Sequence, residues 1–377
     1  MNARQESVPP PPVTVFRALT TDNHGPIGMR QKELLDFFGF REQPFGVTPD
    51  PRYLYLSSGH QYALSSLHYG IESNCGFLVL IAPPGMGKTT MLFDLLTKLD
   101  GKARTAFLFQ NRCTGREFMR LLLAELGQET DTQDFVRMCA QFNHLLLQEA
   151  RAGRRFVIIV DEAQNLDPSV LETIRLLSNF ETPRFKLLQI ILAGQPGLAD
   201  KLIKPSLSQL RQRISSVSGL NPLSAEETCS LIAHRLQVAG YAGKALFSPD
   251  AQALIAEISE GIPRQINKYC LHSLWLAYGE RKHTVDSAMV RTVARRLDIG
   301  QFISEIGPTR ASKLTSQIEE NDTPVQSLDT FTNAVGESSK ERSDDMTERL
   351  TQERLTQEEA VVYMRNLVRR LHSRNKS

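Results

Sequence analysis

The most constraining feature of the sequence is a short apolar run that leads directly into a loop with two glycines. Residues 77–81 are all large and apolar, which is typical of a strand buried on both faces of a parallel sheet. The loop ends in Lys88 and Thr89, and residues 90–99 then show the apolar spacing of an amphipathic helix. This order of strand, loop and helix is that of a phosphate-binding loop.

We expect this loop to bind the phosphates of ATP. Gly85 and Gly87 let backbone N–H groups turn inward, and the following helix points its positive end at the same place. Lys88 supplies positive charge to the β- and γ-phosphates, and the Thr89 hydroxyl is a Mg²⁺ ligand. The first glycine of the motif is Ala82 here, a small change at the strand exit that should leave phosphate binding intact. The residues expected to contact the nucleotide are Pro84, Gly85, Met86, Gly87, Lys88, Thr89 and Thr90.

A second apolar run, at residues 156–160, ends in two acidic residues. Asp161, at the carboxyl end of this strand, is expected to hold Mg²⁺ through water. Glu162 is expected to orient and deprotonate the attacking water. Two acids at a strand end can also cap a helix, but together with the phosphate-binding loop they favour the site of an ATPase.

The remaining pattern predicts an α/β domain followed by helices. Further apolar runs at residues 105–109, 187–192 and, more weakly, 214–217 alternate with amphipathic stretches, which predicts about five parallel strands covered by helices. After Leu220 the pattern is helical only, and Ser224 opens a capping box. Helices are expected near residues 226–239, 249–259, 264–278 and 287–297.

We therefore divide the chain into four parts. We expect residues 1–33 to be a proline-rich, flexible segment, 34–220 the α/β nucleotide-binding domain, 221–300 a helical lid domain, and 301–377 a mostly disordered tail. Within the tail, residues 358–371 regain helical spacing. This C-terminal helix can be a partner-binding helix, a membrane-surface helix or simply a solvated one.

Composition says more about where the protein is located than about what it binds. The longest apolar runs are far below the roughly 20 residues that a membrane helix needs, and the start of the sequence is proline-rich rather than a secretory signal. We expect a cytoplasmic protein with no integral membrane segment. The 5 cysteines are scattered and read as reduced thiols, and a net charge of +2 does not identify a partner.

Three further sites have candidate roles beside plain structural ones. Gln195 follows the run at 187–192 and can sense the γ-phosphate, or merely begin a turn before a proline. Arg211 and Arg213 precede the last strand and can reach the nucleotide of a neighbouring subunit, or be ordinary surface residues. Arg264 begins a helix in the second domain and can bend back onto the γ-phosphate, or only form an N-terminal turn.

These elements, in this order, resemble AAA+ ATPases. Segments across residues 34–297 are similar to the ExeA/GspA branch, the ATPases of general secretion pathways. More distantly, the chain resembles soluble ATPases of the TnsC and MuB type. The segments that carry the resemblance are residues 38–45, 48–56, 161–166, 192–196, 210–213 and 261–264.

The resemblance implies a P-loop fold with strand order 5-1-4-3-2 and ATP bound between the sheet and a helical lid. It makes Lys88 and Thr89 the Walker A residues and Asp161 and Glu162 the Walker B residues. It also makes Gln195 sensor 1 and Arg264 sensor 2, with Arg211 or Arg213 as an arginine finger in a ring or filament. The resemblance further implies that Phe45 and residues 53–56 lie near the adenine.

Two functions remain open, and a third, a nucleotide-binding scaffold without turnover, is disfavoured because Glu162 is intact. The first is an oligomeric ATPase that switches a partner protein in a secretion, pilus or exopolysaccharide system. ExeA-type proteins continue into a membrane helix and a peptidoglycan-binding domain, and this sequence shows neither, which weakens a cell-wall role. The alternative is an ATP-dependent DNA-binding regulator of the transposition type, favoured by basic clusters at residues 151–155 and 291–296.

Overall fold

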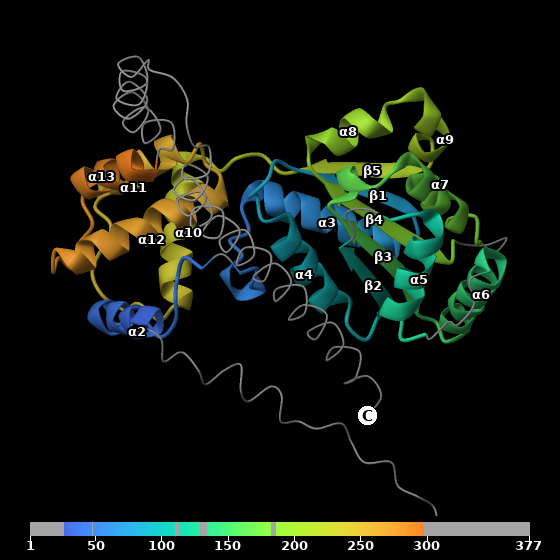
Figure 1. Cartoon of the computed structure of the whole chain (residues 1–377), viewed down its shortest axis with the longest axis horizontal. Helices are drawn as coiled ribbons and strands as arrows, with labels where there is room; N and C mark the ends of the chain where they lie inside the picture. The colour runs from blue at the N-terminus through green and yellow to red at the C-terminus, as the bar shows by residue number, and fades with distance from the viewer. Residues whose placement is uncertain (1–25, 47, 110–112, 129–133, 182–185, 298–377) are drawn as a thin grey trace, which may run out of the picture.

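The structure is a computed structural model that describes residues 26–46, 48–109, 113–128, 134–181 and 186–297. Its elements form two groups, a sheet with its covering helices and a separate group of helices (Figure 1). The predicted tail at 301–377, with its C-terminal helix, and most of the predicted N-terminal segment lie outside the described residues.

Five parallel strands form the sheet, in the order β2-β3-β4-β1-β5. This is the expected order 5-1-4-3-2 read from the other edge, so the predicted α/β fold is confirmed. The strands are β1 (Phe77–Ile81), β2 (Ala103–Phe109), β3 (Arg155–Asp161), β4 (Leu188–Gly194) and β5 (Ile214–Gly219).

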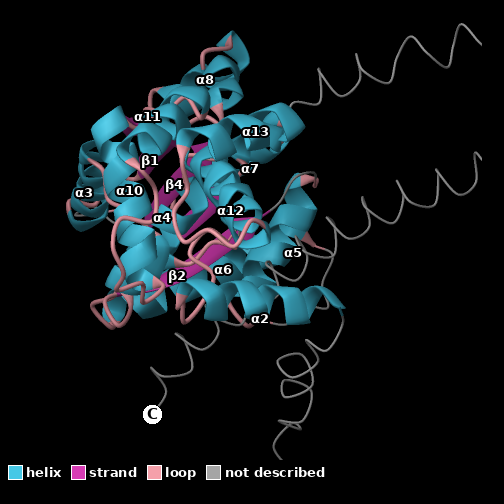
Figure 2. Cartoon of the chain, turned by 90° about the vertical axis from the view of Figure 1, so that its left-hand side faces the viewer, coloured by secondary structure: helices cyan, strands magenta, loops and turns pink. Residues whose placement is uncertain are grey.

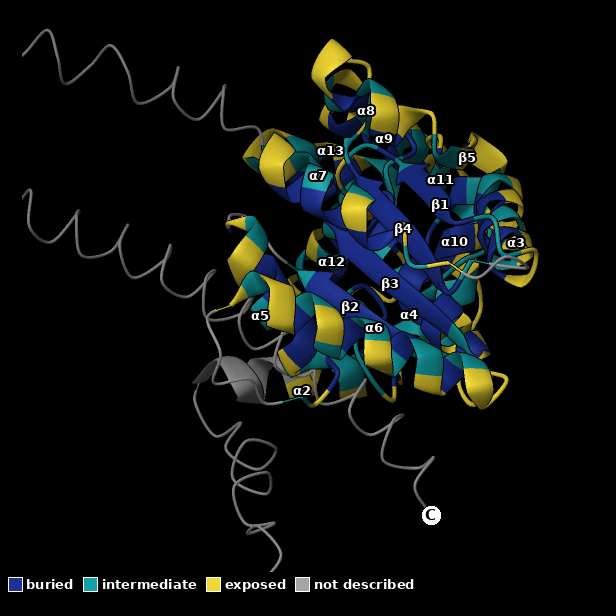
Figure 3. Ribbon diagram, turned by 90° about the vertical axis from the view of Figure 1, so that its right-hand side faces the viewer, coloured by how far each residue is buried: buried dark blue, intermediate teal, exposed yellow. Residues whose placement is uncertain are grey.

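Helices cover both faces of the sheet, because alternate residues of each strand point to opposite faces. In β1, Phe77 and Val79 pack in one hydrophobic cluster and Leu78 and Leu80 in another. Figure 3 shows the central strands fully buried beneath helices whose outer faces are exposed. The first cluster lies under α5 (Gly115–Glu125), α6 (Phe135–Arg151), η2 (Ala163–Asn165), α7 (Pro168–Leu177), α8 (Pro196–Leu202), η3 (Pro205–Leu207) and α9 (Ser208–Arg211), and the second under α3 (Ser58–Glu72) and α4 (Lys88–Leu99).

The lid is the group of four helices that follows the sheet, and it packs around a third hydrophobic cluster. Figure 2 looks onto this side of the molecule. Ser224 and Glu227 form the expected capping box at its start. The helices, close to those expected, are α10 (Ala225–Val238), α11 (Pro249–Ile258), α12 (Pro263–Gly279) and α13 (Ser287–Leu297).

The segment before the sheet packs with the lid. Helix α2 (Pro26–Phe38) lies beside α12, and the turn η1 (Pro51–Tyr53) contacts α10. The boundary expected at residue 34 therefore falls inside a helix. Within this helix, Glu33 accepts a hydrogen bond of 2.9 Å from the Tyr278 hydroxyl of α12, which ties the helix to the lid.

Phe45 belongs to the lid core rather than to an open base-binding surface. Its ring is 1% exposed and meets the ring of Phe247 edge-on, with 6.0 Å between the ring centroids. A small helical core needs large apolar side chains, and this segment supplies one. Phe45 therefore packs within the lid core, and its expected place near the adenine stays a prediction.

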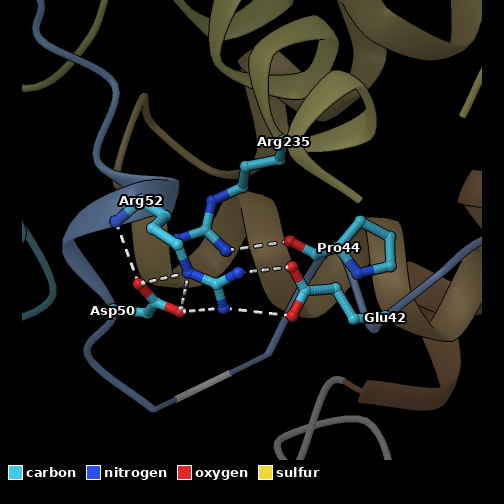
Figure 4. Close-up of polar contacts among 5 residues, drawn as sticks. All are labelled: Glu42, Pro44, Asp50, Arg52 and Arg235. Atoms are coloured by element: carbon cyan, nitrogen blue, oxygen red, sulfur yellow. Dashed lines mark hydrogen bonds and ion pairs between the residues drawn. The ribbon is translucent and has the colours of Figure 1, made fainter. Parts of the chain in front are cut away.

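A polar cluster joins the same segment to α10 (Figure 4). Arg52 donates to both Glu42 and Asp50, and Arg235 on α10 donates to the main-chain carbonyl of Pro44 at 3.0 Å. Burial lowers the pKa of Arg235 to about 10. Moving a cation out of water costs free energy, which the carbonyl of Pro44 and the face of the Tyr53 ring partly offset for Arg235. Loss of these contacts would leave the cation without partners, so they tie the segment to the lid.

Within the ranges that the structure describes, no helix is both long enough and apolar enough to cross a membrane.

Candidate nucleotide-binding site

The loop after β1 turns at its two glycines. Gly85 and Gly87 both have φ of 83°, in the left-handed region that residues with a Cβ rarely adopt. Gly87 is the N-cap of α4 and has no side chain to cap the helix. The first N–H groups of α4 are therefore available to donate hydrogen bonds to an anion. Pro84 is exposed, whereas the Met86 side chain is fully buried, so only the main chain of Met86 is available to a ligand of this loop.

Lys88 begins α4 and is 5% exposed. Its ammonium donates to the main-chain carbonyls of Ala82 and Pro83, at 2.9 and 3.2 Å. Burial lowers its pKa, while the nearby carboxylates of Glu162 and Asp161 act in the opposite direction. The cation thus lies between the loop and the two acids at the end of β3.

Thr89 and Asp161 are brought together by the pairing of elements across the sheet. The Thr89 hydroxyl donates to Asp161 Oδ2 at 2.6 Å, and Asp161 is fully buried. Burial raises the pKa of Asp161, because a carboxylate removed from water is disfavoured, while the hydrogen bond from Thr89 acts in the opposite direction. A hydroxyl and a carboxylate are the hard oxygen ligands that Mg²⁺ prefers, so these residues fit the metal expected from the sequence.

Glu162 stands at the end of the same strand in an unusual conformation. Its φ of 53° and ψ of 34° are left-handed, which costs a non-glycine residue about 1–3 kcal/mol. Gln195, which follows β4, donates to Glu162 Oε2 at 3.2 Å. A second amide, from Gln164, donates to the same oxygen at 2.6 Å. Sequence reasoning predicted Gln195 here and missed Gln164.

The lid contacts the loop directly. The main-chain N–H of Arg264 donates to the carbonyl of Gly85 at 3.2 Å. A Cβ on Gly85 would lie 2.8 Å from Arg264 Cβ and 3.1 Å from Ile262 Cγ2, so the lid fits only against a glycine. Arg264 also lies close enough to Lys88 to lower the pKa of that lysine.

Arg211 and Arg213 are not part of this assembly. The register pairs Ile214 with Phe77, and the phosphate-binding loop starts after Ile81, roughly 13 Å along β1. The two arginines therefore lie at the opposite edge of the sheet from the loop. There Arg213 donates to Ser178 Oγ at 2.7 Å, and Arg211 to the carbonyl of Ile203 at 2.9 Å.

His60 is a buried residue near the loop that sequence reasoning also missed. Its ring nitrogens contact Ser57 Oγ at 2.7 Å and the carbonyl of Met86 at 3.0 Å. On the same helix, Ser58 donates to the carboxylate of the lid residue Glu227 at 3.1 Å. The N-terminus of α3 thus connects the lid to the loop, and no local sequence pattern signals it.

Comparison with known sequences identifies an AAA domain and two related proteins. Residues 71–202 match the AAA domain family. The chain is 39% identical over 251 residues to general secretion pathway protein A of Aeromonas hydrophila, covering 66% of this chain and 46% of that protein. It is also 29% identical over 182 residues to an uncharacterized HTH-type transcriptional regulator of Methanocaldococcus jannaschii, covering 46% of this chain and 44% of that one. The chain spans about half the length of these relatives.

Solved structures share the fold at low identity. The ADP form of the ORC2 protein of Aeropyrum pernix aligns with a TM-score of 0.53 and 13% identity, over 67% of this chain and 72% of that one. Cdc6p of Pyrobaculum aerophilum aligns with a TM-score of 0.51 and 16% identity, over 67% and 70%. Both are similar in the sheet-and-lid architecture alone.

We expect Gly85→Ala to weaken nucleotide binding by about tenfold, because the added Cβ strains the backbone and displaces the lid. Fluorescence titration with a labelled nucleotide measures this. Gly101→Ala is the matched control, since Gly101 also has positive φ but nothing within 4 Å of its Cβ position. Equal affinities in the two variants would argue against a role for the lid contact.

His60 should make stability depend on pH. Burial lowers its pKa below the ordinary value of 6.5, so the unfolded state binds the proton more readily and stability falls as the pH drops below about 6.5. His60→Gln removes this titration, and its melting temperature should fall less between pH 7 and pH 5 than that of the wild type. His144→Gln, at an exposed position on α6, is the control. An unchanged pH slope in His60→Gln would show that His60 does not contribute.

Proposed function

Since the chain carries an AAA ATPase domain of the type found in general secretion pathway protein A, we propose that it binds ATP with Mg²⁺ at the loop after β1 and hydrolyses it. The observation that carries the proposal is the convergence of a buried lysine, two strand-end acids and the lid on one loop. The lysine begins α4, the acids end β3 and the lid contact comes from the start of α12, so three separate elements meet at this loop.

The residues divide the work by their chemistry. Lys88 and the first turn of α4, with Thr90, bind phosphate oxygens. Thr89 and Asp161 hold the metal, which when bound supplies positive charge to the phosphates. Glu162 orients and deprotonates water, and Gln195 lies beside it as sensor 1.

Three arginines make the proposed hydrolysis depend on the lid and on a neighbouring subunit. Arg264 is exposed at the lid end that contacts Gly85, where its side chain can reach a γ-phosphate. Arg211 and Arg213 are separated from their own loop by the length of β1, so they can meet a phosphate only in another subunit. We therefore infer an oligomer, a ring or a filament, with the finger acting across an interface.

The work driven by hydrolysis is proposed from the named relative. General secretion pathway protein A is 39% identical over the aligned region, which favours a partner protein in a secretion or related envelope system. An ATP-dependent change in lid position would be the switch that such a partner reads.

DNA binding is the second candidate, supported by the lid surface. On α13, Arg291, Arg295 and Arg296 are exposed while Met289 and Val293 are buried. The cluster at residues 151–155 favours it less, because Arg154 is paired with Glu149. An ATP-dependent mobility shift that weakens steeply with salt would support DNA over a protein partner.

Substitutions at the two ends of the site test the proposed hydrolysis. Glu162→Gln should lower phosphate release by about 100-fold or more while ATP still binds, because it removes the base and keeps the shape. Lys88→Ala should lose ATP binding as well. Gln148→Ala, at an exposed position on α6, is the control. Phosphate release by Glu162→Gln at the wild-type rate would refute the assignment of the base.

Mixing variants tests the shared site. A chain with Arg211→Ala and Arg213→Ala keeps its loop, and Lys88→Ala keeps its arginines. Each alone should be at least about 100-fold slower than the wild type. Their mixture should regain measurable turnover, because an intact loop can then meet an intact arginine. A mixture as inactive as its components would exclude a finger acting between subunits.

A further inference from the structure

Gln164 lies on η2, between the two residues proposed for the chemistry of water. Its side-chain Nε2 donates to Glu162 Oε2 at 2.6 Å, and its Oε1 accepts a hydrogen bond from the main-chain N–H of Gln195 at 3.0 Å. The amide of Gln195 donates to the same carboxylate oxygen at 3.2 Å. One side chain therefore holds both Glu162 and the start of the segment after β4.

The direction of these bonds is determined by the partners. An ionised carboxylate can only accept, so the NH₂ end of Gln164 must face Glu162. A main-chain N–H can only donate, so the carbonyl end must face Gln195. No flipped amide satisfies both contacts, which gives Gln164 a single orientation.

The position of Gln164 is built by its surroundings. A Cβ on Gly194 would lie 2.7 Å from Gln164 Oε1, so the glycine at the end of β4 leaves the room that the amide occupies. The main chain of η2 is held from α8, where Lys201 Nζ donates to the carbonyls of Gln164 and Leu166 at 2.5 and 2.6 Å.

These contacts bear on the conformation of Glu162. The left-handed backbone at Glu162 persists only where neighbouring structure determines it. Two amides, those of Gln164 and Gln195, donate to one carboxylate oxygen of Glu162, and Lys201 holds the main chain of η2. These contacts provide that support. The same amide also sets the distance between Glu162 and the main chain of Gln195.

We propose that Gln164 is a positioning residue for hydrolysis, which orients the Glu162 carboxylate and couples it to Gln195 without touching nucleotide or metal. This inference rests on the proposed function, and it predicts that loss of the amide slows turnover and leaves nucleotide affinity unchanged. A merely structural amide would instead alter stability or affinity together with turnover.

The test compares Gln164→Ala and Gln164→Glu with the wild type and with Gln148→Ala. Steady-state phosphate release should show kcat lowered by about 10- to 100-fold in Gln164→Ala, because a base misplaced by about 1 Å loses that much. Gln164→Glu keeps an acceptor for Gln195 but places an oxygen against Glu162, so its loss should be at least as large. The Kd for a labelled ATP analogue should stay within about threefold of the wild type in both.

A double variant separates positioning from a general structural effect. Because Gln164 acts through Glu162, Gln164→Ala added to Glu162→Gln should slow the residual turnover no further. Additive losses would overturn the proposal, as would a kcat within twofold of the wild type in Gln164→Ala. So would a loss of affinity or melting temperature that parallels kcat.

Phosphate release by the wild type distinguishes failure of the proposed hydrolysis from failure of the role proposed for Gln164. A wild-type chain that binds the ATP analogue but releases no phosphate, at every protein concentration tested, refutes the proposed hydrolysis and this role with it. An active wild type that depends on Glu162 but not on Gln164 refutes only the positioning role.

Discussion

The site depends on the adjacency of β3, β4 and β1 in a parallel sheet. Parallel strands present their carboxyl ends at one edge, so the loop after β1 meets Asp161 and Glu162 after β3 and Gln195 after β4. Thr89 and Asp161, 72 positions apart in the chain, thereby come within hydrogen-bond reach. The same register sends Arg211 and Arg213 to the other edge, which is why the site has a proposed dependence on a second subunit.

The second constraint is the contact between lid and loop. Gly85 is needed both for its left-handed φ and for the close approach of Arg264 and Ile262. His60, and Ser58 with the lid residue Glu227, add a route from α10 through the start of α3 to the carbonyl of Met86. A shift of the lid would therefore alter the loop directly, as the proposed coupling of nucleotide state to a partner requires.

The segment before the sheet completes the lid. Phe40, Phe45 and Tyr53 are buried in the lid cluster, and Arg235 reaches back to Pro44 (Figure 4). Such a small helical group has limited apolar surface of its own, and the added aromatic rings enlarge its core. The segment also contacts the sheet domain, where the turn η1 meets α4 and where Leu54 and Leu56 pack against the second cluster.

Local sequence order was enough to predict the phosphate-binding loop, the strand-end acids and the helices of the lid, since strand, loop and helix are contiguous and the apolar spacing of each lies within one segment. The strand order was predicted from the resemblance to AAA+ ATPases and not from local spacing. The three-dimensional structure was needed to show that Phe45 packs in the lid and that Gln164 contacts both Glu162 and Gln195. These contacts depend on which strands are neighbours and how closely the lid approaches, and no residue spacing along the chain encodes those distances.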